Sequence, residues 1–200
     1  RLRDGDEGPN TGGMGVVGPV PIEASLREKI EAEIVQPTLR QISGSGMLYR
    51  GVLYIGIMVT PMGPKVIEFN ARFGDPECQV IMPLLDGDWG HVILQLSKGE
   101  LVPMRWKNLS VACVVLAAAG YPDNPKKGVA IEGDLGAQTA SSYFLHAGTA
   151  KSPGGPWTTA GGRVLNAIGV GSTIKEALVA AYGQAKRVTW PGLQMRKDIG

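Results

Sequence analysis

The sequence predicts an α+β fold in two parts, residues 1–104 and residues 105–200. The first part combines a long run of apolar residues at helical spacing with a β-hairpin pattern. The second part consists mostly of short β-rich segments separated by Gly, Pro and Ser residues, followed by one helical pattern. The character of the sequence changes near residues 103–108, so the boundary is expected there.

The first part is expected to begin with a glycine-rich loop over residues 1–21, which holds no periodic apolar pattern. A helix is predicted over residues 22–42. Its apolar positions recur at helical spacing, namely Leu26, Ile30, Ile34, Leu39 and Ile42. Pro37 is expected to break or kink this helix near Gln36, because proline lacks the N–H group that a helix interior needs.

A hairpin is predicted next. Residues 51–60 and 65–70 are rich in β-branched and aromatic residues, and the turn Pro61-Met62-Gly63-Pro64 separates them. Two helices are expected to follow, over residues 77–85 and 89–98, and Gly99 ends the second.

The second part is expected to open with a buried strand over residues 110–118, which are almost all apolar. Ser172 or Thr173 is suited to cap a helix that runs to about Val188. Shorter strands are predicted at Val129–Ile131, Tyr143–His146, Arg163–Ile168 and Leu193–Ile199.

Composition excludes several classes of function. The net charge is only +2 and there is no basic run, so neither nucleic acid nor an acidic membrane is an expected partner. The apolar stretch Val111–Ala119 is far shorter than the roughly 20 residues of a membrane span. Cys78 and Cys113 form no Cys-x-x-Cys pattern and are flanked by apolar residues, which favours buried thiols in a reducing, cytoplasmic environment.

The strand that ends at Asn70 carries the first candidate site. Side chains alternate along a strand, so Glu68 and Asn70 share one face and offer two oxygen ligands suited to Mg²⁺. The polar face of a half-exposed hairpin gives the same alternation. Arg72 has a planar guanidinium that suits a phosphate or carboxylate. Asp75 is suited to bind a sugar hydroxyl or an amine, or to cap the helix that follows.

A glycine-rich loop provides the second candidate site. In the loop of residues 4–15, the glycines permit close approach of a ligand, and Asn10 and Thr11 add side-chain donors and acceptors beside Gly12 and Gly13. The loop is neither a Walker A motif nor a dinucleotide fingerprint. Glycine clusters also form plain turns, and that alternative stays open.

Weaker candidates lie in the second part. His146 stands at the end of a predicted strand, where a lone histidine is more often structural than catalytic. Gly162 precedes a cation at Arg163. Arg196, with Lys197 and Asp198, either contributes charge to a cleft or forms a solvated surface triplet.

Two long motifs resemble the phosphoribosylamine–glycine ligases, a family of ATP-grasp enzymes. They are Gly8-Pro9-Asn10-Thr11-Gly12-Gly13-Met14-Gly15 and Glu68-Phe69-Asn70-Ala71-Arg72-Phe73-Gly74-Asp75-Pro76-Glu77. The resemblance continues in family order over essentially the whole chain, through Gly120-Tyr121-Pro122, Phe144–Thr149, Gly161–Val164 and Arg196–Gly200.

The resemblance implies ligation of glycine to 5-phosphoribosylamine in purine (IMP) biosynthesis. ATP would phosphorylate the glycine carboxylate, and the amine would attack the glycyl phosphate, releasing phosphate beside ADP. Glu68 and Asn70 match the family's Mg²⁺ or Mn²⁺ ligands. Arg72 and Asp75 match a catalytic loop beside the transferred phosphate and the amine.

The family's substrate-binding positions correspond to Asn10, Thr11, Gly12 and Gly13, and further to Arg163 and Arg196. By the same resemblance, residues 1–104 would be the C-terminal part of an ATP-grasp domain, an antiparallel sheet with helices. Residues 105–200 would be a small, mostly β C-terminal domain with one helix.

Two departures from the family pattern stand out. Val16-Val17-Gly18-Pro19 replaces the usual residues after Met14-Gly15, which is a local packing change. The family's N-terminal Rossmann-like domain and the first half of its ATP-grasp domain have no counterpart here. The missing N-terminal half is therefore an expected partner, and these residues alone are expected to be inactive.

Two alternatives remain at this level. One is another ATP-grasp carboxylate–amine ligase or carboxylase, which would share the Glu-x-Asn pair but is not expected to carry both long motifs. The other is a non-catalytic module derived from such an enzyme, in which the glycine loops serve packing.

Overall fold

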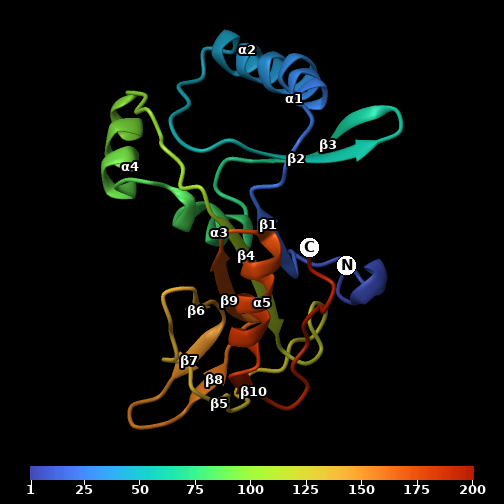
Figure 1. The fold of residues 1–200 in the computed structure, drawn as a ribbon, viewed down its shortest axis with the longest axis vertical. Helices are drawn as coiled ribbons and strands as arrows, with labels where there is room; N and C mark the ends of the chain where they lie inside the picture. The colour runs from blue at the N-terminus through green and yellow to red at the C-terminus, as the bar shows by residue number, and fades with distance from the viewer. The chain divides into compact units, whose positions relative to one another are not determined.

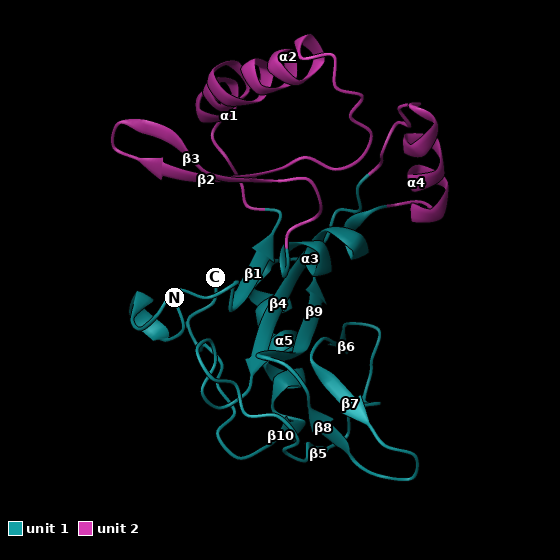
Figure 2. Ribbon diagram, turned by 180° about the vertical axis from the view of Figure 1, so that it is seen from behind, with its two compact units in different colours: residues 1–19, 75–85, 106–200 teal, residues 20–74, 86–105 magenta.

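The computed structural model describes residues 1–200 and divides into two compact units. Unit 1 comprises residues 1–19, 75–85 and 106–200, and unit 2 comprises residues 20–74 and 86–105. Figure 1 traces the chain, and Figure 2 colours the two units separately. Each unit is described by itself.

Unit 1 is built on a four-stranded antiparallel sheet in the order β1-β4-β9-β6. The strands are β1 (Gly15–Gly18), β4 (Ser110–Ala117), β9 (Arg163–Gly171) and β6 (Ser142–His146). The central strands β4 and β9 lie side by side in both views (Figures 1 and 2). The first strand of the chain therefore pairs with a strand from its second half.

Both faces of β4 are buried, which explains its near-continuous apolar sequence. On one face, Ala112, Val114 and Leu116 pack in the cluster that includes Ala177 and Ala181 of α5 (Ile174–Ala185). On the other face, Val111, Cys113 and Val115 pack with Val80 and Leu84 of α3 (Glu77–Leu84). The sheet of unit 1 thus lies between one helix on each side.

Two further pairs of short strands complete unit 1. They are β5 (Glu132–Gly133) with β10 (Val188–Thr189), and β7 (Thr149–Lys151) with β8 (Trp157–Thr159). A 3₁₀ turn, η1 (Asp4–Asp6), lies near the N-terminus. Because Val188 pairs with Gly133, α5 ends at Ala185 rather than at the predicted Val188.

Two predicted strands of unit 1 are wrong. In the first, residues 129–131, only Ala130 forms a β-bridge, an isolated one with Thr158. In the second, residues 193–199, only Gln194 forms a β-bridge, an isolated one with Ala117. In the C-terminal segment, side chains take the backbone donors that a strand would use. The Lys197 N–H donates to Asp4 Oδ1 at 2.7 Å, and the Ile199 N–H donates to Tyr182 Oη at 3.1 Å.

Unit 2 begins with three continuous helical segments, α1 (Ala24–Ile30), the π-helical η2 (Glu31–Val35) and α2 (Gln36–Gly44). The helix continues through Pro37 without the predicted break, but its regular α-helical pattern is interrupted by the π-helical segment that ends directly before Gln36. Pro37 lies in the first turn of α2, directly after the π turn, in which the Gln36 N–H donates to the Glu31 carbonyl. Because of this wider turn, the helix continues through Pro37 although proline has no backbone N–H to donate.

The predicted hairpin of unit 2 consists of β2 (Tyr54–Thr60) and β3 (Gly63–Asn70), with a register shift at Gly56/Ile57. Helix α4 (Trp89–Lys98) begins at Asp88, whose carboxylate accepts from the Gly90 N–H at 2.7 Å. It ends at Gly99, which has a left-handed φ of +84° that favours glycine.

The compact units differ from the predicted division at residues 104/105. Residues 1–19 and 75–85 belong to unit 1, because β1 pairs with β4 and α3 covers one face of the sheet. The functional domain limits of 1–104 and 105–200 stay a prediction. No helix in either unit combines the length and the apolar character needed to cross a membrane.

Candidate functional site

Arg163 joins two of the predicted sites within unit 1. At the start of β9, its Nη1 donates to the carbonyls of Gly12, at 2.7 Å, and Asp75, at 2.6 Å. Its Nη2 forms an ion pair with Asp75 Oδ2 at 2.9 Å. One guanidinium therefore ties the glycine-rich loop to the loop that follows the predicted metal strand.

The peptide groups of Gly12 and Gly13 are held by protein partners. The Gly12 N–H donates to Tyr121 Oη at 3.0 Å, and the Gly13 N–H donates to Thr11 Oγ1 at 3.2 Å. These two N–H groups are thus engaged within unit 1. A ligand of this loop would instead meet the exposed side chain of Asn10 and the free hydrogen-bonding capacity of Thr11.

Close packing explains why both positions are glycine. A Cβ at Gly12 would lie 3.2 Å from Arg163 Cζ. Gly13 has a φ of +110°, and a Cβ there would lie 2.6 Å from Pro76 Cδ. Side chains at these positions would push the loop away from Arg163 and Pro76.

Asp75 is held at both carboxylate oxygens. Oδ2 pairs with Arg163, and Oδ1 accepts from Gln79 Nε2 at 2.8 Å. The capping role that the sequence also allowed is not taken up, since the N-cap position of α3 is Pro76 and no side chain caps it. The Asp75 side chain remains 49% exposed, so a ligand has access to it.

Glu68 and Asn70 lie on β3 of unit 2. Asn70 Nδ2 donates to Glu68 Oε1 at 2.8 Å, which confirms that they share a face. Glu68 Oε2 and Asn70 Oδ1 are then the oxygens that fit a hard divalent cation. No group of three or more His, Cys, Asp or Glu residues that could hold a metal is present. A cation here would therefore need further ligands from water or phosphate.

Arg72 follows the same strand in unit 2. It is exposed, and its Nη1 donates to the Phe73 carbonyl at 2.7 Å. The remaining guanidinium donors of Arg72 are sufficient to contact an anion.

Arg196 lies in a different part of unit 1 from Arg163. Its Nη1 pairs with Asp6 Oδ1 at 2.7 Å, and its Nε and Nη2 bind both oxygens of Asp198. Hydrogen bonds from Arg196 and from the Gly5 N–H hold the pKa of Asp198 below its usual range, and the pKa of Arg196 is raised. Arg196 thus connects the two ends of the chain.

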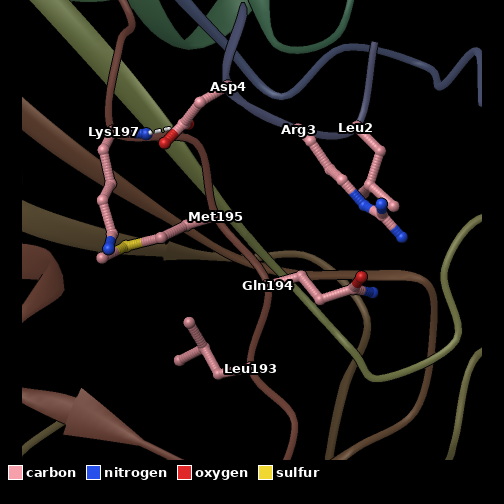
Figure 3. A pocket seen from close by; sticks show the side chains of 7 residues that line it. All are labelled: Leu2, Arg3, Asp4, Leu193, Gln194, Met195 and Lys197. Carbon is pink, nitrogen blue, oxygen red and sulfur yellow. Dashed lines mark hydrogen bonds between the residues drawn. The ribbon is translucent and has the colours of Figure 1, made fainter. Parts of the chain in front are cut away.

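A cavity of about 360 Å³ lies beside this network (Figure 3). It is lined by Leu2, Arg3, Asp4, Leu193, Gln194, Met195 and Lys197. Of these residues, Lys197 belongs to the weakly predicted triplet with Arg196 and Asp198, and Asp4 begins the predicted glycine-rich loop.

His146 has structural partners. Its Nδ1 lies 2.8 Å from Thr149 Oγ1, and the centre of its ring lies 4.4 Å from the centre of the Trp157 ring.

The thiols of Cys78 and Cys113 form no disulfide. Burial raises the pKa of both, and Cys113 is buried whereas Cys78 is partly exposed.

Comparison with known families identifies the chain. The family model described as "Phosphoribosylglycinamide synthetase, ATP-grasp (A) domain" matches residues 1–78, and the C-domain model of the same enzyme matches residues 111–200. The chain belongs to the phosphoribosylglycinamide synthetase family. The predicted resemblance is therefore confirmed.

Curated relatives named phosphoribosylamine–glycine ligase match the whole chain. Those of Caulobacter vibrioides and Caldanaerobacter subterraneus are 46% and 42% identical to it. The chain covers 48% of each, so it spans about half the length of the curated relatives it matches.

Two solved structures share the α+β fold of this chain. The crystal structure of phosphoribosylamine–glycine ligase from Thermotoga maritima is 40% identical, with a TM-score of 0.86, and is matched over 100% of this chain and 49% of its own. The biotin carboxylase domain of a thermophilic 2-oxoglutarate carboxylase has a TM-score of 0.65 at 14% identity, over 91% of this chain and 41% of its own. At that identity it shares the fold alone.

Sequence reasoning did not assign Gln79 or Tyr121 to the site. Gln79 follows Asp75 at the i+4 spacing of one helical turn, which is a usable signal. Tyr121 reaches Gly12 from a distant turn, and no local pattern points to that contact.

Proposed function

We propose that the protein containing this chain ligates glycine to 5-phosphoribosylamine, giving glycinamide ribonucleotide while ATP is split to ADP and phosphate. The observation that carries the proposal is the bonding of Arg163 to both Gly12 and Asp75, because it unites two motifs typical of this family. The names of the relatives and the synthetase family support the same reaction.

The proposed reaction has two steps. A glycine carboxylate oxygen attacks the γ-phosphorus of ATP, ADP leaves, and glycyl phosphate forms. The amine of phosphoribosylamine then attacks the glycyl carbonyl carbon, phosphate leaves with the C–O bonding pair, and the nitrogen loses a proton. A carboxylate needs such a leaving group, so positioning and charge neutralisation are the main tasks of the protein.

Each candidate group has a proposed task. Glu68 and Asn70 would hold Mg²⁺ or Mn²⁺, which supplies positive charge to the phosphates when bound. Arg72 would stabilise charge on the transferred phosphoryl group, and Asp75 would orient the amine. The loop containing Asn10 and Thr11 would contact substrate.

The other loop and arginine positions have supporting tasks in the proposal. Gly12 and Gly13 give the substrate loop its close-packed shape. Arg163 acts on this loop through its bond with Gly12. Arg196 would contribute to substrate binding through the segment that it holds, because its guanidinium is already paired with Asp6 and Asp198.

The test measures ADP formation by the full-length protein in a buffered solution containing Mg²⁺, with phosphoribosylamine generated in situ. We expect turnover that requires glycine and yields glycinamide ribonucleotide by mass spectrometry. Bicarbonate or formate in place of glycine should give none. The 200 residues alone should be inactive, because the relatives are about twice as long. Turnover with bicarbonate or formate but not glycine would favour another ATP-grasp ligase or carboxylase.

A further inference from the structure

We propose that Gln79 and Arg163 are positioning residues that hold the Asp75 carboxylate in one orientation for the amine substrate. This inference rests on the proposed function. The residues come from the start of α3 and the start of β9, and all three belong to unit 1.

The carboxylate is fixed at each oxygen by a different donor. Gln79 Nε2 lies 2.8 Å from Oδ1, and Arg163 Nη2 lies 2.9 Å from Oδ2. Arg163 Nη1 also binds the Asp75 carbonyl at 2.6 Å, which anchors the backbone of the same residue. An ionised carboxylate has about four acceptor positions. Two protein donors therefore restrict its rotation and leave capacity for a substrate amine.

Gln79 has only one workable amide orientation. Its Nε2 donates to Asp75, and its Oε1 is buried without a hydrogen-bond partner. Rotating the amide by 180° would place Oε1 against Asp75 Oδ1, two acceptors facing each other. A buried unpaired acceptor lowers stability, so an apolar side chain of similar size would be at least as stable here. The presence of an amide at this position, despite that cost, fits a role in positioning Asp75.

Arg163 differs from Gln79 because it also holds the glycine loop. Its Nη1 binds the Gly12 carbonyl, whose residue is held at its N–H by Tyr121. A change at Gln79 should therefore disturb Asp75 alone. A change at Arg163 should disturb both Asp75 and the substrate loop.

The test uses Gln79→Met in the full-length protein, which removes the donor at similar volume. We expect kcat/KM for phosphoribosylamine to fall about 10- to 100-fold, the same order as the loss when a hydrogen-bonding group that orients a metal ligand is removed. The KM for ATP should change less than about twofold, and the melting temperature should not fall, because the buried unpaired acceptor is removed as well.

Gln95→Met is the matched control. Gln95 also lies on a helix, α4, and also has a buried Oε1 without a partner, but it has no bond to Asp75. Its substitution should leave kcat/KM unchanged. Equal kinetics for Gln79→Met and Gln95→Met would overturn the inference.

A double-mutant cycle tests whether Gln79 acts through Asp75. In the Asp75→Asn background, Gln79→Met should change kcat/KM by less than about twofold, because the group it positions is already altered. An undiminished effect in that background, or a loss of activity that follows a loss of melting temperature, would mean a merely structural role.

Arg163→Lys provides a second variant. Lysine keeps the charge but cannot make the forked contact, so both kcat and the KM for phosphoribosylamine should change. Unchanged kinetics for this variant would count against the role of Arg163. If the unsubstituted protein lacked glycine-dependent turnover, the proposed function itself would fail, and this inference with it.

Discussion

Asn70 and Glu68 occupy one face of β3 with their side chains hydrogen-bonded to each other. The bond engages Asn70 Nδ2 and leaves Asn70 Oδ1 as the amide atom suited to a cation. The amide is thereby oriented by its neighbour before any cation binds. Two oxygens alone satisfy only part of a Mg²⁺ coordination shell, which matches a cation that is shared with substrate phosphates.

At this residue scale, Glu68→Gln tests the metal proposal in the full-length protein. Glutamine keeps the acceptor for Asn70 but removes the negative charge. Outer-sphere changes at metal sites already cost about 10- to 100-fold, and we expect a ligand change to lower activity at least as much. The Mg²⁺ concentration for half-maximal activity should rise, as measured by titration. Glu23→Gln, on an exposed residue before α1, is the control. An unchanged Mg²⁺ requirement in Glu68→Gln would exclude Glu68 as a ligand.

At the scale of elements, the contact between α5 and β9 defines the main core of unit 1. Gly169 of β9 lies directly beneath the helix, and a Cβ there would overlap the Ala177 carbonyl and the Ala181 amide nitrogen. Gly183 of α5 is exposed and has open space around its Cα. Close packing therefore requires glycine at position 169, whereas no contact requires it at position 183.

Alanine at these two positions should shift stability in opposite directions. Gly169→Ala should destabilise unit 1 by about 3 kcal/mol or more, at the upper end of overpacking effects, because the obstacle is backbone. Gly183→Ala should stabilise it by about 0.5–1 kcal/mol through lower chain entropy in the unfolded state. Urea denaturation followed by circular dichroism measures both. Equal midpoints for the two variants would contradict the packing argument.

At the scale of the whole molecule, the two ends of the chain meet within unit 1. The Gly5 N–H donates to Asp198 Oδ2 at 2.8 Å, and Arg196 pairs with Asp6 as well as with Asp198. Figure 1 shows the N and C termini on the same side of unit 1. The cavity of Figure 3 is formed by the same two terminal segments.

These terminal contacts predict a pH dependence of stability. The pKa of Asp198 is lowered in the folded state, so the unfolded chain takes up a proton first as the pH falls. The stabilisation is therefore present above the usual aspartate pKa of about 3.9 and is lost as the pH drops through and below it. Asp198→Asn should lower the urea midpoint at neutral pH and flatten its acidic decline.

Glu176→Gln provides an independent comparison, because bonds from Ser172 lower the pKa of Glu176 at the start of α5. It should flatten the acidic decline separately from Asp198→Asn. If the urea midpoint of Asp198→Asn fell as steeply at acidic pH as that of the unsubstituted chain, the ion pairs between the two ends of the chain would not contribute to the pH dependence.

Local patterns predicted much of the fold. Alternation identified the hairpin and the shared face of Glu68 and Asn70, and Gly99 marked the end of α4. Long-range contacts were beyond such patterns. Arg163 and Asp75 are far apart in sequence, and nothing near either residue indicates that they meet. The π turn before Pro37 was also not predicted, because the rule that proline breaks a helix does not consider a wider turn of the preceding backbone.

The pairing of β1 with β4 has a consequence for synthesis on the ribosome. Gly18 lies opposite Val111, so β1 emerges long before its only sheet partner. The segments of unit 2 are complete once residue 105 has been made, whereas β4 starts at residue 110. Until then a nascent chain carries β1 as an unpaired strand with free backbone donors and acceptors. The residues of β1 are thus made before those of unit 2 but reach their native sheet partner after them, and they need protection from other nascent chains in the interval.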